Sequence, residues 1–219
     1  MPYLLHLETA TNICSVVLSE NEKLIALKET SVSNSHSSVL TIFIEDVLQS
    51  AKIGIKDLSA VCISEGPGSY TGLRIGVSTA KGLCYAIDIP LIAVNTLQSM
   101  AYFFKENFSS LATGNTLLCP MLDARRMEVY SAFFDMDLNF VRQTLADIIE
   151  ENSYSELLAL NKIIFFGNGS TKCKPLLAKH KNAVFADDFN ASAKGMLIPG
   201  YNKFQKNEFV DLAYFEPFY

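Results

Sequence analysis

Residues 61–87 have the sequence VCISEGPGSYTGLRIGVSTAKGLCYAI. The apolar start is typical of a buried strand, and Gly66 and Gly68, which flank a proline, indicate a tight turn after it. Ser69 or Thr71 then offers a side-chain cap for a following helix. The stretch therefore predicts a strand, a glycine turn and a long helix, a combination typical of α/β proteins.

Small residues recur on one face of the helix predicted over residues 68–87. Gly72, Gly76, Ala80 and Cys84 follow one another at four-residue spacing. Glycine inside a helix costs about 0.5–1 kcal/mol relative to alanine, so two glycines on one face indicate that another segment approaches closely there. We expect that segment to be a helix of a partner protein, in which case Gly76→Leu blocks association and leaves the monomer folded. The alternative is that the stripe packs inside the chain's own fold.

Composition and charge narrow the class of protein. The chain has 219 residues, of which 49% are hydrophobic, enough for one large domain or two small ones. Its apolar runs are shorter than the roughly 20 residues of a membrane span, and no basic segment precedes the first of them, so we expect a cytoplasmic protein. The formal net charge of −5 argues against autonomous binding of nucleic acid.

The five cysteines are widely spaced and form no CxxC pair. Their apolar context predicts buried thiols rather than disulfides or metal ligands. The three histidines, His6, His36 and His180, lie far apart and have no ligand-type residue at helical spacing. A zinc or other transition-metal site needs three or four such ligands, so we expect no metal.

The periodicity of apolar residues predicts two similar halves. The first half is expected to contain strands at residues 4–7, 15–18, 23–29, 58–64 and 90–94, and helices at 36–51, 68–87 and 95–104. After a predicted linker at 107–115, the second half is expected to contain strands at 117–122, 128–134, 140–143, 162–166 and 183–186, and helices at 154–160, 171–180 and from 191 onward. The repeated order indicates a duplicated α/β architecture.

Several segments together resemble one protein family. They are the glycine segment SEGPGSYTGLRIG at 64–76, LHLET at 5–9, DARRMEVY at 123–130, FGNG at 166–169 and EPFY at 216–219. This set is similar to the bacterial TsaB (YeaZ) family of tRNA threonylcarbamoyladenosine biosynthesis proteins, over nearly the whole length. Ala10 departs from the family, which more often has serine there.

The resemblance implies the ASKHA fold of actin-like ATPases, with two ribonuclease-H-like halves. We expect an N-terminal half at residues 1–105, completed by a helix at about 190–219, and a smaller half at 106–189. The resemblance also implies a noncatalytic subunit that binds TsaD and TsaE, reaches tRNA only through the complex, and forms a homodimer when isolated. Thr96 and Met100 occupy the positions where the catalytic relative has its metal-binding histidines, so the resemblance implies no cofactor and no metal.

The expected partner interface lies on the helices over residues 39–51 and 72–84. Its predicted members are His36, Val39, Ile42, Phe43, Ser69, Tyr70, Gly72, Leu73, Gly76, Val77, Ala80 and Cys84. Two of them have other interpretations. His36 is also typical of a hydrogen-bonded residue at a helix start, and Ile42 of an additional core contact.

A nucleotide site is the weaker hypothesis for the strand ends. Its candidates are Glu8, Thr9, Gly68 and Arg125, because actin-like ATPases have an acidic residue and a hydroxyl near the phosphates and a guanidinium can bind phosphate at two points. The glycine spacing matches neither dinucleotide nor P-loop signatures. We therefore favour helix packing for the glycines, a polar strand end for Glu8 and turn-closing ion pairs around Arg125.

The sequence is compatible with three alternative functions. The first is the noncatalytic scaffold, the second an autonomous actin-like ATPase or small-molecule kinase, and the third a self-associating structural protein. A kinase binds and turns over ATP–Mg²⁺ alone, whereas a scaffold co-purifies with its partner. A structural protein forms a homodimer without a different partner.

Overall fold

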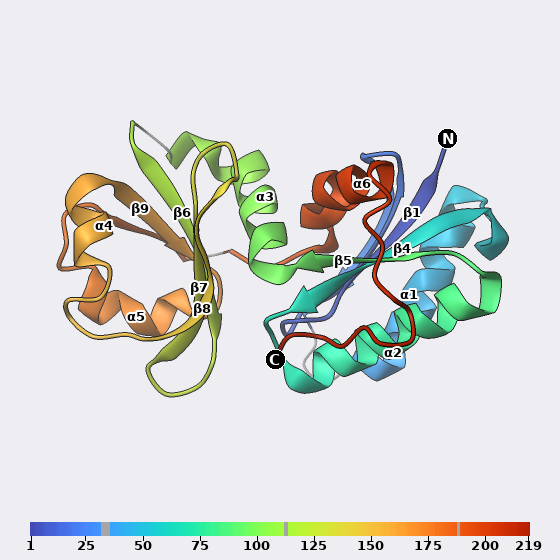
Figure 1. Cartoon of the computed structure of the whole chain (residues 1–219), viewed down its shortest axis with the longest axis horizontal. Helices are drawn as coiled ribbons and strands as arrows, with labels where there is room; N and C mark the ends of the chain where they lie inside the picture. The colour runs from blue at the N-terminus through green and yellow to red at the C-terminus, as the bar shows by residue number, and fades with distance from the viewer. Residues whose placement is uncertain (32–35, 112–113, 188) are drawn as a thin grey trace. The chain divides into compact units, whose positions relative to one another are not determined.

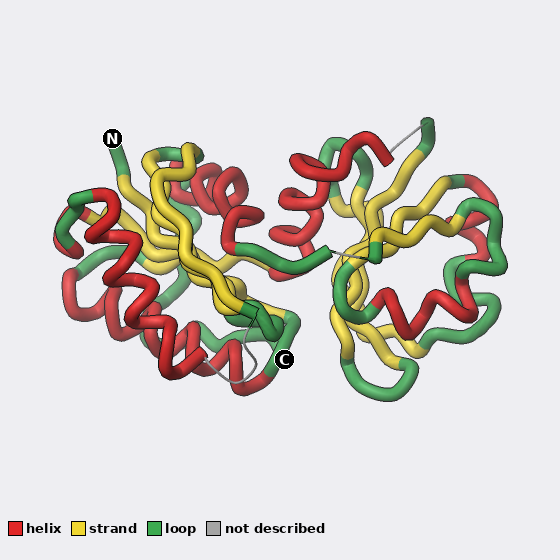
Figure 2. The backbone as a smooth tube through the Cα atoms, turned by 180° about the vertical axis from the view of Figure 1, so that it is seen from behind, coloured by secondary structure: helices red, strands yellow, loops and turns green. Residues whose placement is uncertain are grey.

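The computed structural model describes residues 1–31, 36–111, 114–187 and 189–219 (Figure 1). It divides into two compact units. Unit 1 comprises Met1–Ser99 and Ala191–Tyr219, and unit 2 comprises Met100–Asn190. Each unit has its own sheet with helices packed against it, as Figure 2 shows.

Unit 1 is built on a five-stranded mixed sheet with the order β3-β2-β1-β4-β5. Its strands are β1 (Tyr3–Glu8), β2 (Cys14–Glu20), β3 (Lys23–Thr30), β4 (Leu58–Gly66) and β5 (Leu91–Asn95). The first three form an antiparallel meander, whereas β4 and β5 run parallel to β1. The ends of β1 and β4 therefore lie side by side at one edge of the sheet.

Helices cover both faces of this sheet, which explains why its central strands are apolar on both sides. On one face lie α1 (His36–Ala51) and α2 (Tyr70–Ile87), with the short η1 (Ile55–Asp57) before β4. On the other lie η3 (Ala193–Met196) and α6 (Leu197–Gln205). The final segment of the chain thus completes unit 1 rather than extending unit 2.

Unit 2 repeats this plan with the sheet order β8-β7-β6-β9-β10. Its strands are β6 (Thr116–Asp123), β7 (Glu128–Phe134), β8 (Phe140–Ile148), β9 (Lys162–Phe166) and β10 (Ala183–Ala186), and its helices are α4 (Ser155–Leu160) and α5 (Ser170–Leu177). α3 (Thr96–Phe108) brings Phe104 onto the Phe166 ring with 4.1 Å between centroids. As in unit 1, three strands are antiparallel and two are parallel, so the duplicated α/β architecture is confirmed.

Some predicted boundaries are wrong for local reasons. β8 continues to Ile148 because it pairs with β7 over that length, and the helix expected from residue 191 begins as η3. The linker predicted at 107–115 contains the end of α3 and η2 (Ser109–Leu111), while residues 112–113 lie outside the described part of the chain. All five cysteines are buried free thiols, as predicted.

The small-residue stripe of α2 packs inside unit 1, so its assignment to a partner helix is wrong. Its members Gly72, Gly76, Ala80 and Cys84 are all buried, as are Leu73 and Val77 next to them. A Cβ atom on Gly72 would lie 2.1 Å from the Thr9 carbonyl oxygen, and one on Gly76 would lie 2.2 Å from Thr9 Oγ1. The segment that approaches the helix is therefore the chain's own turn after β1.

Two glycines of α2 provide a matched test of this packing. Gly76 faces Thr9, whereas a Cβ on Gly82 meets nothing within 4 Å. We expect Gly82→Ala to raise the free energy of unfolding by about 1 kcal/mol through helix propensity. Gly76→Ala should lower it by about 1–3 kcal/mol because of overpacking, and Gly76→Leu should disrupt the monomer. Urea unfolding measures both, and equal stabilisation by the two alanines would show that Gly76 is not packed.

Candidate functional site

The edge formed by the ends of β1 and β4 holds a buried carboxyl group. Glu8 Oε1 accepts hydrogen bonds from the Ala10 N–H (2.6 Å) and from Ser64 Oγ (3.1 Å). Glu8 Oε2 has no hydrogen-bond partner among the residues that the structure describes. Burial of the side chain raises its pKa to about 7, and the hydrogen bonds to the carboxyl group offset only part of this rise. Glu8 is thus the polar end of β1 that the sequence favoured, but it is fully buried.

The turn after β1 is pressed against the glycine turn after β4. The Ser69 N–H donates to the Ala10 carbonyl oxygen at 2.7 Å, and a Cβ on Gly68 would lie 2.5 Å from that same oxygen. Ser69 Oγ caps α2 by accepting from the Gly72 N–H at 3.3 Å, which confirms one of the two predicted caps. Gly68 therefore permits a backbone contact within the fold.

His36, the first residue of α1, contacts the turn after β1 through hydrogen bonds. Its side chain is buried, and its Nε2 lies 2.9 Å from the Thr11 carbonyl oxygen and 3.2 Å from that of Ile13. A ring N–H that donates to these carbonyls ties the first residue of the helix to the loop between β1 and β2. The interface assignment of His36 is therefore wrong, and its alternative as a hydrogen-bonded residue at a helix start is correct.

Burial limits the ability of the Glu8 carboxyl group to bind a phosphate or a metal ion. Glu8, Thr9 and Ser64 are fully buried, and Thr9 Oγ1 lies against α2 with no hydrogen-bond partner among the described residues. A phosphate or a metal needs ligand atoms that it can reach. Within the described ranges, no group of three or more His, Cys, Asp or Glu residues is placed to hold a metal ion.

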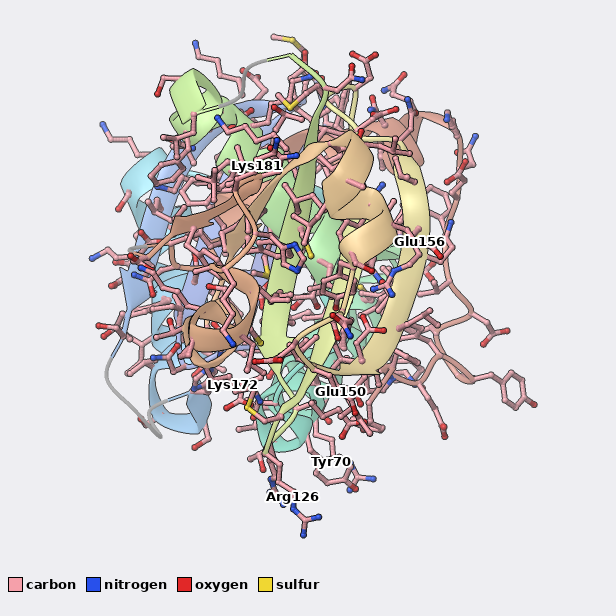
Figure 3. All side chains as sticks on the ribbon, turned by 90° about the vertical axis from the view of Figure 1, so that its left-hand side faces the viewer. Tyr70, Arg126, Glu150, Glu156, Lys172 and Lys181 are labelled. Atoms are coloured by element: carbon pink, nitrogen blue, oxygen red, sulfur yellow. The ribbon has the colours of Figure 1, made fainter. Side chains whose placement is uncertain are left out.

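Arg125 belongs to unit 2, in the turn between β6 and β7. The Asp123 carboxylate accepts from the Arg125 N–H at 2.9 Å and pairs with Lys172, which also donates to the Glu128 carbonyl oxygen at 2.7 Å. Arg126, at the tip of this turn, extends away from the ribbon in Figure 3. The charges around Arg125 thus close a turn within one unit, and the closing ion pair uses Lys172 rather than either arginine.

The exposed side of α2 carries a second stripe, which combines three small residues with one tyrosine. We define the outer strip as Thr71, Ser78, Gly82 and Tyr85, all of which are exposed. Gly82 has open space around it, and the Tyr85 side chain is 84% exposed. A glycine in an exposed helix interior costs helix stability, and none of the described residues packs against a Cβ position on Gly82. This strip was not predicted from the sequence, although Gly82 lies off the buried stripe and could have marked it.

α1 adds an apolar group to the same side of the sheet. Ile42 is 54% exposed, so its alternative as a core contact is wrong. Val39 and Phe43 are half-buried against the core, whereas Ser69 and Tyr70 are exposed at the start of α2. Of the predicted interface, the residues left at the surface are therefore Ile42, Ser69 and Tyr70, with partial contributions from Val39 and Phe43.

The buried Glu8 carboxyl predicts a pH-dependent stability. Its pKa is about 7 when folded and near its ordinary value of 4.5 when unfolded, so the folded state binds the proton more tightly. The contribution of Glu8 is therefore fully favourable below about pH 4.5 and falls as the pH rises toward 7, by up to about 3 kcal/mol. We expect Glu8→Gln to be more stable than the wild type at pH 8 and to lose most of that advantage at pH 5.

Urea unfolding at both pH values measures this difference. Glu22→Gln, in the exposed turn between β2 and β3, is the control and should follow the wild-type pH dependence. If Glu8→Gln followed it too, Glu8 would not be the titrating group.

Comparison with known proteins places the chain in a family. A family model described as "TsaD: tRNA N6-adenosine threonylcarbamoyltransferase" matches residues 28–214. The Escherichia coli protein TsaB is 29% identical over 99% of this chain and 93% of its own length. TsaB of Bacillus subtilis is 31% identical over 66% of this chain and 60% of its own length.

Solved structures agree on the fold. A Pseudomonas aeruginosa protein described as similar to the peptidase YEAZ superposes with a TM-score of 0.85 at 21% identity, covering 100% of this chain and 99% of that one. An Arthrobacter polyphosphate/ATP-glucomannokinase reaches a TM-score of 0.51 at 9% identity, covering 94% of this chain and 100% of that one. The fold is thus the ASKHA fold shared with sugar kinases. The chain belongs to the TsaD family, and its similar relatives in that comparison are bacterial proteins named TsaB.

Proposed function

We propose that this chain is a noncatalytic subunit for tRNA threonylcarbamoyladenosine biosynthesis. It binds a TsaD-family protein in the cytoplasm and, together with TsaE, supports transfer of the threonylcarbamoyl group to the adenosine beside the anticodon. The names of its relatives support the pathway. With a net charge of −5, the chain contacts tRNA through the assembled complex rather than alone.

The outer strip of α2 is the proposed partner-binding surface. Gly82 leaves the α2 backbone open to the close approach of another helix, and Tyr85 of α2 and Ile42 of α1 expose apolar surface on the same side of the sheet. Helices pack closely where small residues lie between larger apolar ones. In isolation, a second copy of the chain can use the same surface, so a homodimer competes with the TsaD partner.

The enclosed strand ends support a role without catalysis. In an autonomous ATPase or kinase of this fold, the acidic residue after β1 must reach the phosphates or their magnesium. Here Glu8 is fully buried, and Thr9 lies between β1 and the glycines of α2. This arrangement disfavours the kinase alternative, for which hydrolysis of ATP–Mg²⁺ by the isolated chain is the direct assay.

Gly82→Leu tests the proposed partner surface. The variant should fold normally, because the added side chain meets open space. We expect its affinity for the TsaD of the same organism to fall by at least about tenfold, since the leucine prevents close helix contact. Co-purification and titration calorimetry measure this, and modified adenosine in digested tRNA from a depleted strain that carries the variant should fall as well.

Ala159→Leu on α4 of unit 2 is the matched control, because it adds a leucine at another exposed helical position. It should bind TsaD and restore the modification like the wild type. Normal binding by Gly82→Leu would place the interface elsewhere. Unchanged modification after complete depletion of the protein would refute the function.

A further inference from the structure

The last residues of the chain form a tail that returns along α2. The tail, residues 209–219, has no helix and contributes a single β-bridge, between Val210 and Leu91. Lys81 of α2 donates to the carbonyl oxygens of Ala213 (3.2 Å) and Phe215 (3.0 Å). In Figure 1 the tail runs beside α2 to the end of β4. The tail therefore borders α2 over most of the length of the helix.

The tail is held differently in its two parts. Its base, residues 210–215, packs Val210, Leu212 and Phe215 against the core of unit 1. Its tip, residues 216–219, is held mainly through polar and ring contacts at the surface. Few buried contacts mean that a segment opens at a lower free energy than the core around it. The tip can thus detach while the base remains in place.

The tip docks on the turn that starts α2. The Phe218 N–H donates to the Glu65 carbonyl oxygen at 2.7 Å, and the Phe218 carbonyl oxygen lies 2.0 Å from the position of a Cβ on Gly66. Only glycine at position 66 leaves room for this approach. The backbone of the tip is therefore fitted to this turn and does not merely lie near it.

The docked tip fixes two side chains at the border of the outer strip. The rings of Tyr219 and Tyr70 lie 4.5 Å apart, and Tyr219 Oη accepts from Arg74 Nε at 3.2 Å. The Arg74 guanidinium lies 4.5 Å from the Tyr70 ring centroid. Tyr70 is still 53% exposed and precedes Thr71 of the outer strip. Tyrosine and arginine are the residue types enriched among energetically dominant interface contacts.

We propose that the tip, residues 216–219, is a detachable latch that preorganises Tyr70 and Arg74 for partner binding. This inference rests on the proposed function, because the partner is the TsaD-family protein that binds the outer strip. The latched tip places Tyr219 against both Tyr70 and Arg74, so binding costs less ordering of these side chains. Detachment frees both side chains and weakens binding without unfolding unit 1.

Tyr219→Ala removes the ring contact and the hydrogen bond to Arg74. We expect it to weaken TsaD binding about three- to tenfold in titration calorimetry. Hydrogen exchange of the free protein should accelerate at the Phe218 amide of the tip, while β1, β4 and the Ser69 amide keep their protection. Tyr214→Ala is the matched control, because Tyr214 lies in the same tail and is 85% exposed. It should bind like the wild type.

The outcomes separate the latch from the function on which it rests. If Gly82→Leu loses TsaD and Tyr219→Ala binds like the wild type, the latch is refuted and the function stands. Tighter binding by Tyr219→Ala also overturns the latch, because the tip is then a cover over the surface. If neither variant affects binding, the partner surface itself is wrong. In the wild type, the Phe218 amide should exchange faster than the Val210 amide, and equal rates contradict detachment.

Discussion

The contact between the turn after β1 and the backbone of α2 is the constraint on which unit 1 depends. The Thr9 carbonyl and hydroxyl oxygens occupy the space where side chains on Gly72 and Gly76 would lie, and the Ala10 carbonyl oxygen binds the Ser69 N–H. Glycine costs helix stability at these positions, so the close approach is what makes glycine favourable there. The turn is thus fixed by α2 from one side and by His36 of α1 from another.

This constraint explains why α2 has two different faces. The buried stripe packs against the turn after β1, and the Glu8 carboxyl group at the end of that strand is removed from solvent. The outer strip does not pack against the strand ends, and it exposes Gly82 and Tyr85. One helix can therefore define the fold through one stripe of small residues and offer a partner surface through another.

Much of the architecture was predictable from the sequence, because apolar periodicity and turn residues report directly on local structure. The buried thiols, the Ser69 cap and the duplicated α/β pattern were all predicted correctly. The packing partner of the small-residue stripe was not predicted correctly. Spacing shows that Gly72 and Gly76 share a face, but it does not show whether that face meets the chain's own sheet or a partner.

The remaining site features depend on contacts between distant segments. Glu8 is buried because β1 lies between β2 and β4 and α2 covers its end, which no local pattern reveals. The latch joins Tyr219 to Tyr70 across most of the chain. Gly82 was the exception, because it lies off the buried stripe and could have marked the outer strip, although this was not predicted from the sequence.

Native-state hydrogen exchange at the Ser69 amide tests the central claim most directly. This N–H lies at an exposed helix start, and its bond to the Ala10 carbonyl oxygen is the hydrogen bond that joins the two turns. If the contact between the turn and α2 is an integral part of unit 1, the Ser69 amide exchanges only on global unfolding, with the same free energy as Ile63 in the centre of β4. Exchange of Ser69 through local opening, while Ile63 stays protected, would contradict the account.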